Sequence, residues 1–343
     1  MSKYWGKNRL YRFLRPYVDH TARSCFASIQ VEGSVPDDGR AIIFTPNHTN
    51  TLLDPLVLLQ NFPRKPILFG ARADIFRKPL AAKLLHFLHI VPLARERDGR
   101  SSLEKNLDVF PVIMDELRSG NPFCLFPEGA HKLKHTLRAI RKGTSRLAFE
   151  NAAEQPTCVV PVGLEYSDFL TFRGRCKMRF GEPIDVNEYI EAHKDELKSD
   201  QYWGFSDLLW GRMASLINYI PEDEFYEKRL DETMPIPPKP WWRIPLAVIT
   251  FPFFLAAAAL ALPLWLPAEL ICARVIKDKA FSNSVRFLCK LFISPLALIL
   301  WTVLGFCLLH PLVAAGVIVF FLFSYSIFYD WLNLITWKHR RLS

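Results

Sequence analysis

The sequence lacks the residue patterns that define most metal and redox proteins. Its 7 cysteines include no CxxC pair and no metal-ligand spacing. It also contains no glycine-rich dinucleotide loop and no GxSxG nucleophile elbow. We therefore expect buried, reduced thiols, no metal site and no resident cofactor. The N-terminus has no uninterrupted apolar segment, so no signal peptide is expected.

Acidic residues are fewer than basic ones, and the charge is unevenly distributed. The 343 residues carry a formal charge of +9. Such a charge is typical of proteins that bind nucleic acid, anionic membranes or phosphorylated substrates. Residues 1–240 have mixed charge, whereas residues 244–336 are overwhelmingly apolar. The apolar region favours a membrane, and because no nucleic-acid-binding motif is recognisable, no nucleic-acid partner is expected.

Residues 1–24 are expected to form an amphipathic helix that lies in a membrane interface. Aromatic and aliphatic side chains within residues 3–23 are interleaved with lysine and arginine. This mixture is typical of helices that lie among lipid headgroups. Nucleic-acid binding is the alternative interpretation of such a segment.

Residues 25–234 show short apolar runs that alternate with helical patterns. This alternation predicts an α/β domain, a mixed sheet flanked by helices. The expected strands cover residues 25–33, 41–47, 66–72, 89–95, 123–129, 158–166 and 176–183. The expected helices cover residues 55–62, 79–88, 101–119, 143–154 and 203–219. Active sites on such sheets form from the loops at strand ends.

A membrane region is predicted at residues 244–343, after a proline-rich linker and tryptophan anchor at 235–243. The stretches 287–309 and 312–336 are each long enough to cross a bilayer. Lysine and arginine lie before the first stretch and after the second, but not in the turn between them. This asymmetry predicts a transmembrane helix hairpin, with the α/β domain on the cytosolic face. The proline-rich stretch 244–273 is expected to form a re-entrant or interfacial hairpin, and a single crossing is the alternative.

The stretch NHTNTLLDP places a histidine and an aspartate close together in the sequence. His48 could act as a general base whose tautomer is fixed by Asp54. The alternative is an ordinary helix start, with Asp54 as the N-cap and Pro55 as the first helical residue. The two interpretations are compatible if Asp54 begins the helix and also accepts a hydrogen bond from His48.

Two further candidates follow apolar runs. FPEG (126–129) favours a tight turn, after which backbone amides beyond Gly129 would face an anion. The next residues are rich in lysine and arginine, and a solvated basic loop is the alternative interpretation. Arg95 ends the run HIVPLAR, and its guanidinium is well suited to holding phosphate, although single arginines of this kind are usually surface residues.

Taken in order, these segments resemble the glycerolipid acyltransferases that acylate glycerol phosphate and lysophosphatidate. The resemblance covers about residues 25–185. It rests on NHTNTLLD (47–54), ARADIFRKP running on to VPLAR (71–95), LFPEG with LRAIRKGTSRLAF (125–149), and VVPVG (159–163). The commonest motif of the family has four residues between histidine and aspartate. This sequence has five, as does one branch of the family, and Ala130 and His131 replace the usual residues after FPEG.

The resemblance implies a glycerol-phosphate acyltransferase-like fold and a direct acyl transfer. His48, oriented by Asp54, would take the proton from a glycerol hydroxyl, and that oxygen would attack an acyl thioester. Arg95, Arg72 and the FPEG loop would hold the phosphate of the acceptor.

The resemblance also implies roles for residues next to this pair. Glu128 and Gly129 would belong to the phosphate-binding loop, with Glu128 ordering that loop or a basic residue, and a turn-capping carboxylate is the alternative for Glu128. Pro161 would shape the acyl channel, and an ordinary core strand is the alternative there.

The expected activity is therefore that of a membrane-bound O-acyltransferase of phospholipid synthesis, which makes phosphatidate from lysophosphatidate. The expected co-substrate is acyl-CoA or acyl carrier protein, and the other partner is membrane lipid. Glycerol 3-phosphate or another lysophospholipid is the alternative acceptor. A non-catalytic lipid-binding membrane protein on the same fold is the alternative from another class.

Overall fold

The computed structural model describes residues 9–63, 65–94 and 106–342. Within these ranges the strands form one sheet in the order β1-β7-β6-β2-β5-β3-β4, with β8 paired to β6. The strands are β1 (Phe26–Glu32), β2 (Ala41–Pro46), β3 (Leu68–Arg72), β4 (Ile90–Leu93), β5 (Phe123–Cys124), β6 (Thr157–Tyr166), β7 (Gly174–Phe180) and β8 (Ile184–Asp185). Only β7 and β8 run antiparallel to their neighbour β6. The predicted mixed α/β sheet is confirmed.

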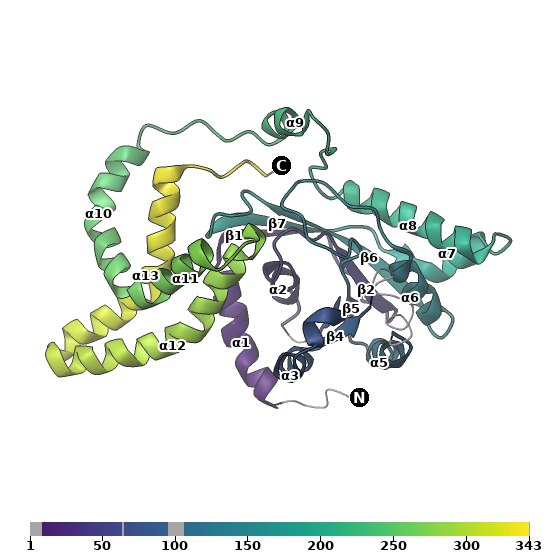
Figure 1. Ribbon diagram of the computed structural model, residues 1–343, viewed down its shortest axis with the longest axis horizontal. Helices are drawn as coiled ribbons and strands as arrows, with labels where there is room; N and C mark the ends of the chain where they lie inside the picture. The colour runs from purple at the N-terminus through teal and green to yellow at the C-terminus, as the bar shows by residue number, and fades with distance from the viewer. Residues whose placement is uncertain (1–8, 64, 95–105, 343) are drawn as a thin grey trace.

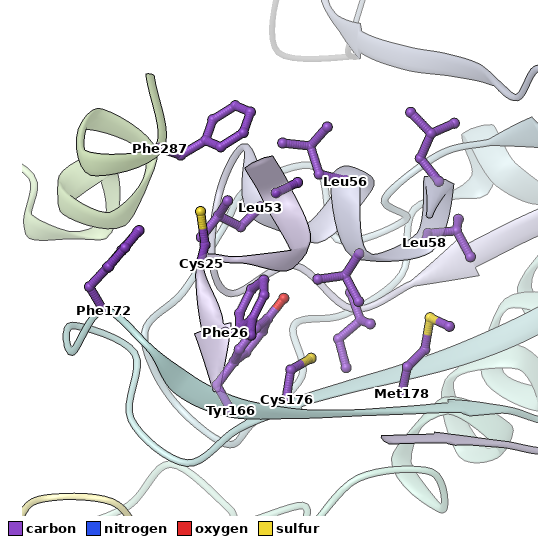
Figure 2. Packing of buried hydrophobic residues seen from close by; sticks show 14 of the residues in the cluster. Cys25, Phe26, Leu53, Leu56, Leu58, Tyr166, Phe172, Cys176, Met178 and Phe287 are labelled. Carbon is purple, nitrogen blue, oxygen red and sulfur yellow. The ribbon is translucent and has the colours of Figure 1, made fainter. Parts of the chain in front are cut away.

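Helices cover both faces of the sheet. Neighbouring residues of its central strands point to opposite sides, and both sets are apolar, so each face needs a covering layer. Phe44 and Val160 pack into one cluster with α1 (Arg9–Arg23), α2 (Leu53–Leu59) and residues of the C-terminal helices. Ile43 and Val159 pack into the other cluster. Its helices are α5 (Asn106–Arg118), α6 (Lys142–Ala152), α7 (Val186–Ala192) and α8 (Lys198–Ala214). Figure 2 shows α2 over the first face, with Phe287 of the C-terminal region at its side.

The remaining elements of this domain are short. The 3-10 helix η1 (Ala73–Phe76) and helix α3 (Pro79–Phe87) connect β3 to β4, and α9 (Tyr226–Thr233) follows α8. The predicted strand 123–129 ends at Cys124, because the Pro127–Gly129 segment turns away from the sheet. Part of the predicted helix 101–119, residues 101–105, lies outside the described residues.

The C-terminal region consists of α10 (Arg243–Leu260), α11 (Leu262–Arg274), the 3-10 helix η3 (Lys279–Phe281), α12 (Ser282–Leu308) and α13 (Pro311–Thr336). Among the described residues, three helical segments are long and apolar enough to cross a membrane: 243–260, 279–308 and 311–336. In Figure 1, α12 and α13 run side by side and extend away from the sheet. The hairpin thus exists as a structure, whereas its crossing of the membrane and the path of residues 244–273 stay predictions.

Helix α1 exposes part of its apolar side chains. Leu10 is 56% exposed and Phe13 is 79% exposed. The opposite side of the helix is anchored by Arg15, which donates to the carbonyl oxygens of Leu59 and Phe62 at the end of α2. An exposed apolar face is what an interfacial helix requires, and the interfacial location of α1 stays a prediction.

Candidate active site

The predicted site residues follow the carboxyl ends of neighbouring parallel strands. His48 lies two residues after β2, FPEG lies after β5, and Arg72 is the last residue of β3. Because β2, β5 and β3 are parallel neighbours, these three ends lie along one edge of the sheet. The path of the chain therefore gathers residues that are more than 70 positions apart in the sequence.

His48 and Asp54 lie in direct contact. The Nδ1 atom of His48 is 2.8 Å from Oδ2 of Asp54, and Asp54 is fully buried. The same oxygen accepts hydrogen bonds from the backbone amides of Thr49 and Asn50, each over 2.8 Å. With the carboxylate ionised, the His48 proton sits on Nδ1, so Nε2 carries the lone pair that a general base needs.

The N-cap interpretation of Asp54 is wrong. Helix α2 begins at Leu53, and Leu52 occupies the N-cap position without a side-chain hydrogen bond. Asp54 lies inside the first turn, and its carboxylate points back to the preceding loop rather than to the helix amides. Its acceptor capacity is used by His48 and the loop, so the helix start is left without a side-chain cap.

Tyr166 completes the shell around Asp54, and the sequence interpretation missed it. Its hydroxyl donates to Oδ1 of Asp54 over 2.6 Å, and its ring is buried. Figure 2 shows the ring rising from the sheet with its hydroxyl oxygen toward α2. Burial beside the Asp54 carboxylate raises the pKa of Tyr166 well above its ordinary value, so its hydroxyl remains a donor. The only available signal was a polar aromatic residue at the end of the buried strand CVVPVGLEY.

Glu128 ties the FPEG turn to the His48 loop. Its Oε1 accepts from the backbone amide of His48 and its Oε2 from the backbone amide of Arg138, both over 2.9 Å. Burial raises the pKa of this carboxyl, and the two amides partly offset the rise. Gly129 has a backbone φ of +66°, a conformation that glycine adopts without strain. The contacts agree with an ordering role for Glu128 in the loop, exerted on backbone amides rather than on a basic side chain.

The ring of His48 is held between aromatic groups but not sealed. Phe126 packs against it with ring centroids 4.2 Å apart, and the ring of His131 stands nearly perpendicular to it at 5.9 Å. The side chain of His48 remains 19% exposed, whereas that of Asp54 is 0% exposed. A buried carboxylate behind a partly open imidazole can activate a hydroxyl group that approaches from outside.

The predicted phosphate-binding residues differ in where the structure places them and in what they contact. Arg95 lies outside the described residues. Arg72 is at the expected edge of the sheet, where its side chain pairs with Asp74. In the basic stretch after FPEG, Lys132 and Lys134 both pair with Glu222. The amide of Lys132 donates to the His48 carbonyl oxygen, so this amide is occupied within the protein.

Pro161 lies on the face of the sheet opposite α2. It is buried in β6, and its ring lies near Gly181 and Leu216. Its neighbours in sequence, Val160 and Val162, belong to the cluster that includes α2. The structure thus places Pro161 in the sheet core, and the predicted role in an acyl channel stays a prediction.

Asn47, directly before His48, is a second residue that the sequence interpretation missed. Its side chain donates to the carbonyl oxygen of Leu164 over 2.9 Å and accepts from the amide of Leu164 over 2.6 Å. This paired contact continues the β2–β6 ladder beyond Pro46 and fixes the point from which the His48 loop departs.

Comparison with known proteins finds similarity to acyltransferases. Residues 28–165 match the Acyltransferase family model. A segment of 120 residues is 26% identical to an uncharacterized acyltransferase of Schizosaccharomyces pombe, and it covers 34% of this chain and 18% of that protein. A segment of 94 residues is 35% identical to glycerol-3-phosphate O-acyltransferase 2 of Saccharomyces cerevisiae, and it covers 26% of this chain and 13% of that protein.

A solved structure is also similar, at low identity. The 1-acyl-sn-glycerophosphate acyltransferase of Thermotoga maritima aligns with a TM-score of 0.41 and 18% sequence identity. The alignment covers 61% of this chain and 83% of that chain. The matched segments span less than one fifth of either yeast relative.

Proposed function

We propose that this chain, a member of the glycerolipid acyltransferase family, transfers a fatty acyl chain from an acyl thioester to the hydroxyl of lysophosphatidate. The family assignment rests on residues 28–165. The product is phosphatidate. The single observation that carries the proposal is the contact of His48 Nδ1 with the buried carboxylate of Asp54, with Nε2 left on the far side of the imidazole ring.

The reaction proceeds by general-base catalysis. Nε2 of His48 takes the proton of the acceptor hydroxyl while the oxygen attacks the thioester carbonyl carbon. The carbon–sulfur bond then breaks, and the leaving thiolate receives the proton from His48. Asp54 stabilises the imidazolium that exists between these steps. The donor is acyl-CoA or acyl carrier protein, and the chemistry needs neither a metal nor a resident cofactor.

Positioning of the two substrates supplies much of the rate enhancement. Arg95, Arg72 and the FPEG loop are the proposed phosphate-binding groups, as the family resemblance implies; FPEG follows β5 and Arg72 ends β3, at the edge of the sheet where His48 lies. The basic character of this edge suits an anionic acceptor that stays partly in the membrane. The α12–α13 hairpin would cross the membrane, with the acyltransferase domain on the cytosolic face.

Glycerol 3-phosphate is the second candidate acceptor. The observation in its favour is the 94-residue similarity to a yeast protein named glycerol-3-phosphate O-acyltransferase. Both acceptors present a hydroxyl close to a phosphate, so the same base and the same cationic groups serve either one.

The test is acyl transfer by the purified full chain in lipid vesicles. Thioester consumption should depend on an added acceptor, and lysophosphatidate should be used faster than glycerol 3-phosphate or lysophosphatidylcholine. His48→Ala should lower kcat/KM by about 10²–10⁴-fold, the usual contribution of a general base. Asp54→Asn should have a comparable effect because a neutral amide cannot stabilise the imidazolium charge that forms during transfer.

His193→Ala is the matched control. His193 follows the last residue of α7, on the opposite side of the sheet, and its ring Nδ1 bonds to the carbonyl oxygen of Tyr189 in that helix. Full activity of His48→Ala would refute the assignment of the base. Acceptor-independent thioester loss, or lipid binding without turnover, would favour the non-catalytic alternative.

A further inference from the structure

The spacer between His48 and Asp54 contains a strained residue. Thr51 has a backbone φ of +43°, in the left-handed region that β-branched residues rarely adopt. Such a conformation persists only when surrounding contacts hold it. The residues just before it, Thr49 and Asn50, donate their amides to Asp54, so the turn at Thr51 directs the chain back around the carboxylate.

The contacts that hold Thr51 come from the C-terminal helices. Its Oγ1 lies 2.7 Å from Oγ of Ser284 in α12, and it donates to the carbonyl oxygen of Ala280 over 3.3 Å. The same Ser284 oxygen accepts from the amide of Leu52 over 3.3 Å. Thr51, Ala280 and Ser284 are all buried. A hydroxyl 233 positions away therefore bonds both the side chain of the strained residue and the amide of the residue after it.

The same part of the chain also contacts the loop after FPEG. We call residues 278–284 the connector; they comprise Asp278, the 3-10 helix η3 and the first residues of α12. Asp278 accepts from Nε2 of His131 over 2.8 Å, and the ring of Phe281 stands against His131 at 5.3 Å. Asp278 also caps the start of η3 by accepting from the amide of Ala280 over 3.0 Å. The connector thus touches both loops that surround His48.

We propose that Ser284 is a positioning residue for acyl transfer. By holding Thr51 in the left-handed conformation, it keeps Asp54 in contact with His48 across the five-residue spacer. The inference rests on the proposed function for its kinetic consequence. It further means that the catalytic pair is in working geometry only while α12 is seated on the domain.

The physical basis is the unequal preference of side chains for a positive φ. Without the Ser284 hydroxyl, Thr51 can relax toward negative φ, and the Thr49 and Asn50 amides then turn away from Asp54. Glycine at position 51 has no such preference, so a spacer with glycine needs the Ser284 contact less. Thr51→Gly also removes the hydroxyl that meets Ser284. Thr51→Ala removes the same hydroxyl but keeps the preference for negative φ, so the comparison of alanine with glycine separates backbone strain from the loss of the hydrogen bond.

The experiment is a double-mutant cycle in the full chain, with Ser284→Ala, Thr51→Gly and the combined variant. Ser284→Ala should lower kcat about tenfold with little change in the acceptor KM, because the base rather than the binding site is disturbed. In the Thr51→Gly background the same substitution should lower kcat by less than about twofold, and Thr51→Ala alone should lower kcat about tenfold, whereas Thr51→Gly alone should lower it less than about twofold. Ser324→Ala is the control, since Ser324 is a buried serine of α13 whose hydroxyl donates to the carbonyl oxygen of Phe321 in the same helix.

Hydrogen exchange gives a readout that does not depend on activity. The Thr49 and Asn50 amides should exchange faster in Ser284→Ala than in the wild-type chain. When glycine is at position 51, Ser284→Ala should leave their exchange close to that of Thr51→Gly alone. Equal losses of kcat in Thr51→Ala and Thr51→Gly, or unchanged amide protection in Ser284→Ala, would overturn the positioning role. If the wild-type chain transfers no acyl group, the proposed function fails, and the exchange data still decide whether Ser284 holds the spacer.

Discussion

The hydroxyl of Tyr166 donates to Oδ1 of Asp54 over 2.6 Å, across 112 positions of sequence. The other carboxylate oxygen, Oδ2, accepts hydrogen bonds from His48 and from two backbone amides. Asp54 is therefore hydrogen-bonded through both oxygens while fully buried, and these bonds offset the cost of taking its polar atoms out of water.

Removal of this hydroxyl should weaken catalysis. In Tyr166→Phe, the buried carboxylate loses the donor to Oδ1 and is held less firmly against His48. We expect kcat to fall about tenfold, with little change in the KM of the acceptor. The measurement is the kinetics of acyl transfer, with Tyr226→Phe as control, because the Tyr226 hydroxyl bonds elsewhere, to the amide of His135. An unchanged kcat would show that Tyr166 serves packing alone.

Glu128→Gln should loosen the junction between the His48 loop and the FPEG turn. The wild-type carboxylate accepts from two backbone amides, whereas the glutamine side chain offers one acceptor and turns a donor toward the other amide. The free energy of unfolding should fall by about 1–3 kcal/mol. Thermal unfolding in detergent measures it. Glu182→Gln, which alters an exposed carboxylate paired only with Arg212, should leave the melting temperature almost unchanged.

Acid should destabilise the protein through His135. Burial, reinforced by Arg340, lowers the pKa of His135 to about 4, against 6.5 in the unfolded chain. Between these values the unfolded state binds a proton that the folded state excludes, so this contribution to stability is lost as the pH falls from 6.5 toward 4. The loss amounts to about 3 kcal/mol at most.

Melting curves over this pH range test the assignment. His135→Gln should flatten the dependence, whereas substitution of the exposed His20 by glutamine should not. An unchanged pH slope in His135→Gln would place the acid sensitivity elsewhere.

The hairpin of α12 and α13 makes a topological prediction. If both helices cross the bilayer, the turn at His310 lies on the opposite side from the connector. In a background with Cys272 and Cys307 replaced by alanine, His310→Cys and Lys277→Cys should react with an impermeant maleimide from opposite sides of sealed vesicles. Labelling of both cysteines from one side would exclude the crossing.

Much of the fold was predictable because it follows from local patterns. The apolar runs around Ile43 and Val159 have the length and composition of buried strands, and the observed β2 and β6 agree closely with them. FPEG was expected to extend its strand, but Pro127 and Gly129 end it at Cys124. Short apolar runs do not reveal whether the next residues stay in the sheet, because turn residues decide it.

The site was predictable only in part. His48, Asp54 and Glu128 were identified from motif blocks, and the structure brings them into one network. The N-cap interpretation of Asp54 failed because a carboxylate can serve either helix amides or loop amides, and the sequence does not distinguish them. Tyr166 and Ser284 carried no motif, since their relevance depends on partners far away in the chain.

The sequence by itself determined which segments become strands and helices, how long the apolar helices are, and which residue types can perform acyl transfer. These properties depend on neighbours within a few positions. The tertiary structure alone decided that Tyr166 and Ser284 meet the spacer between His48 and Asp54, because contacts across 112 and 233 positions arise only when sheet and helices assemble. The orientation of the base, and with it the chemistry, is therefore a property of the assembled fold.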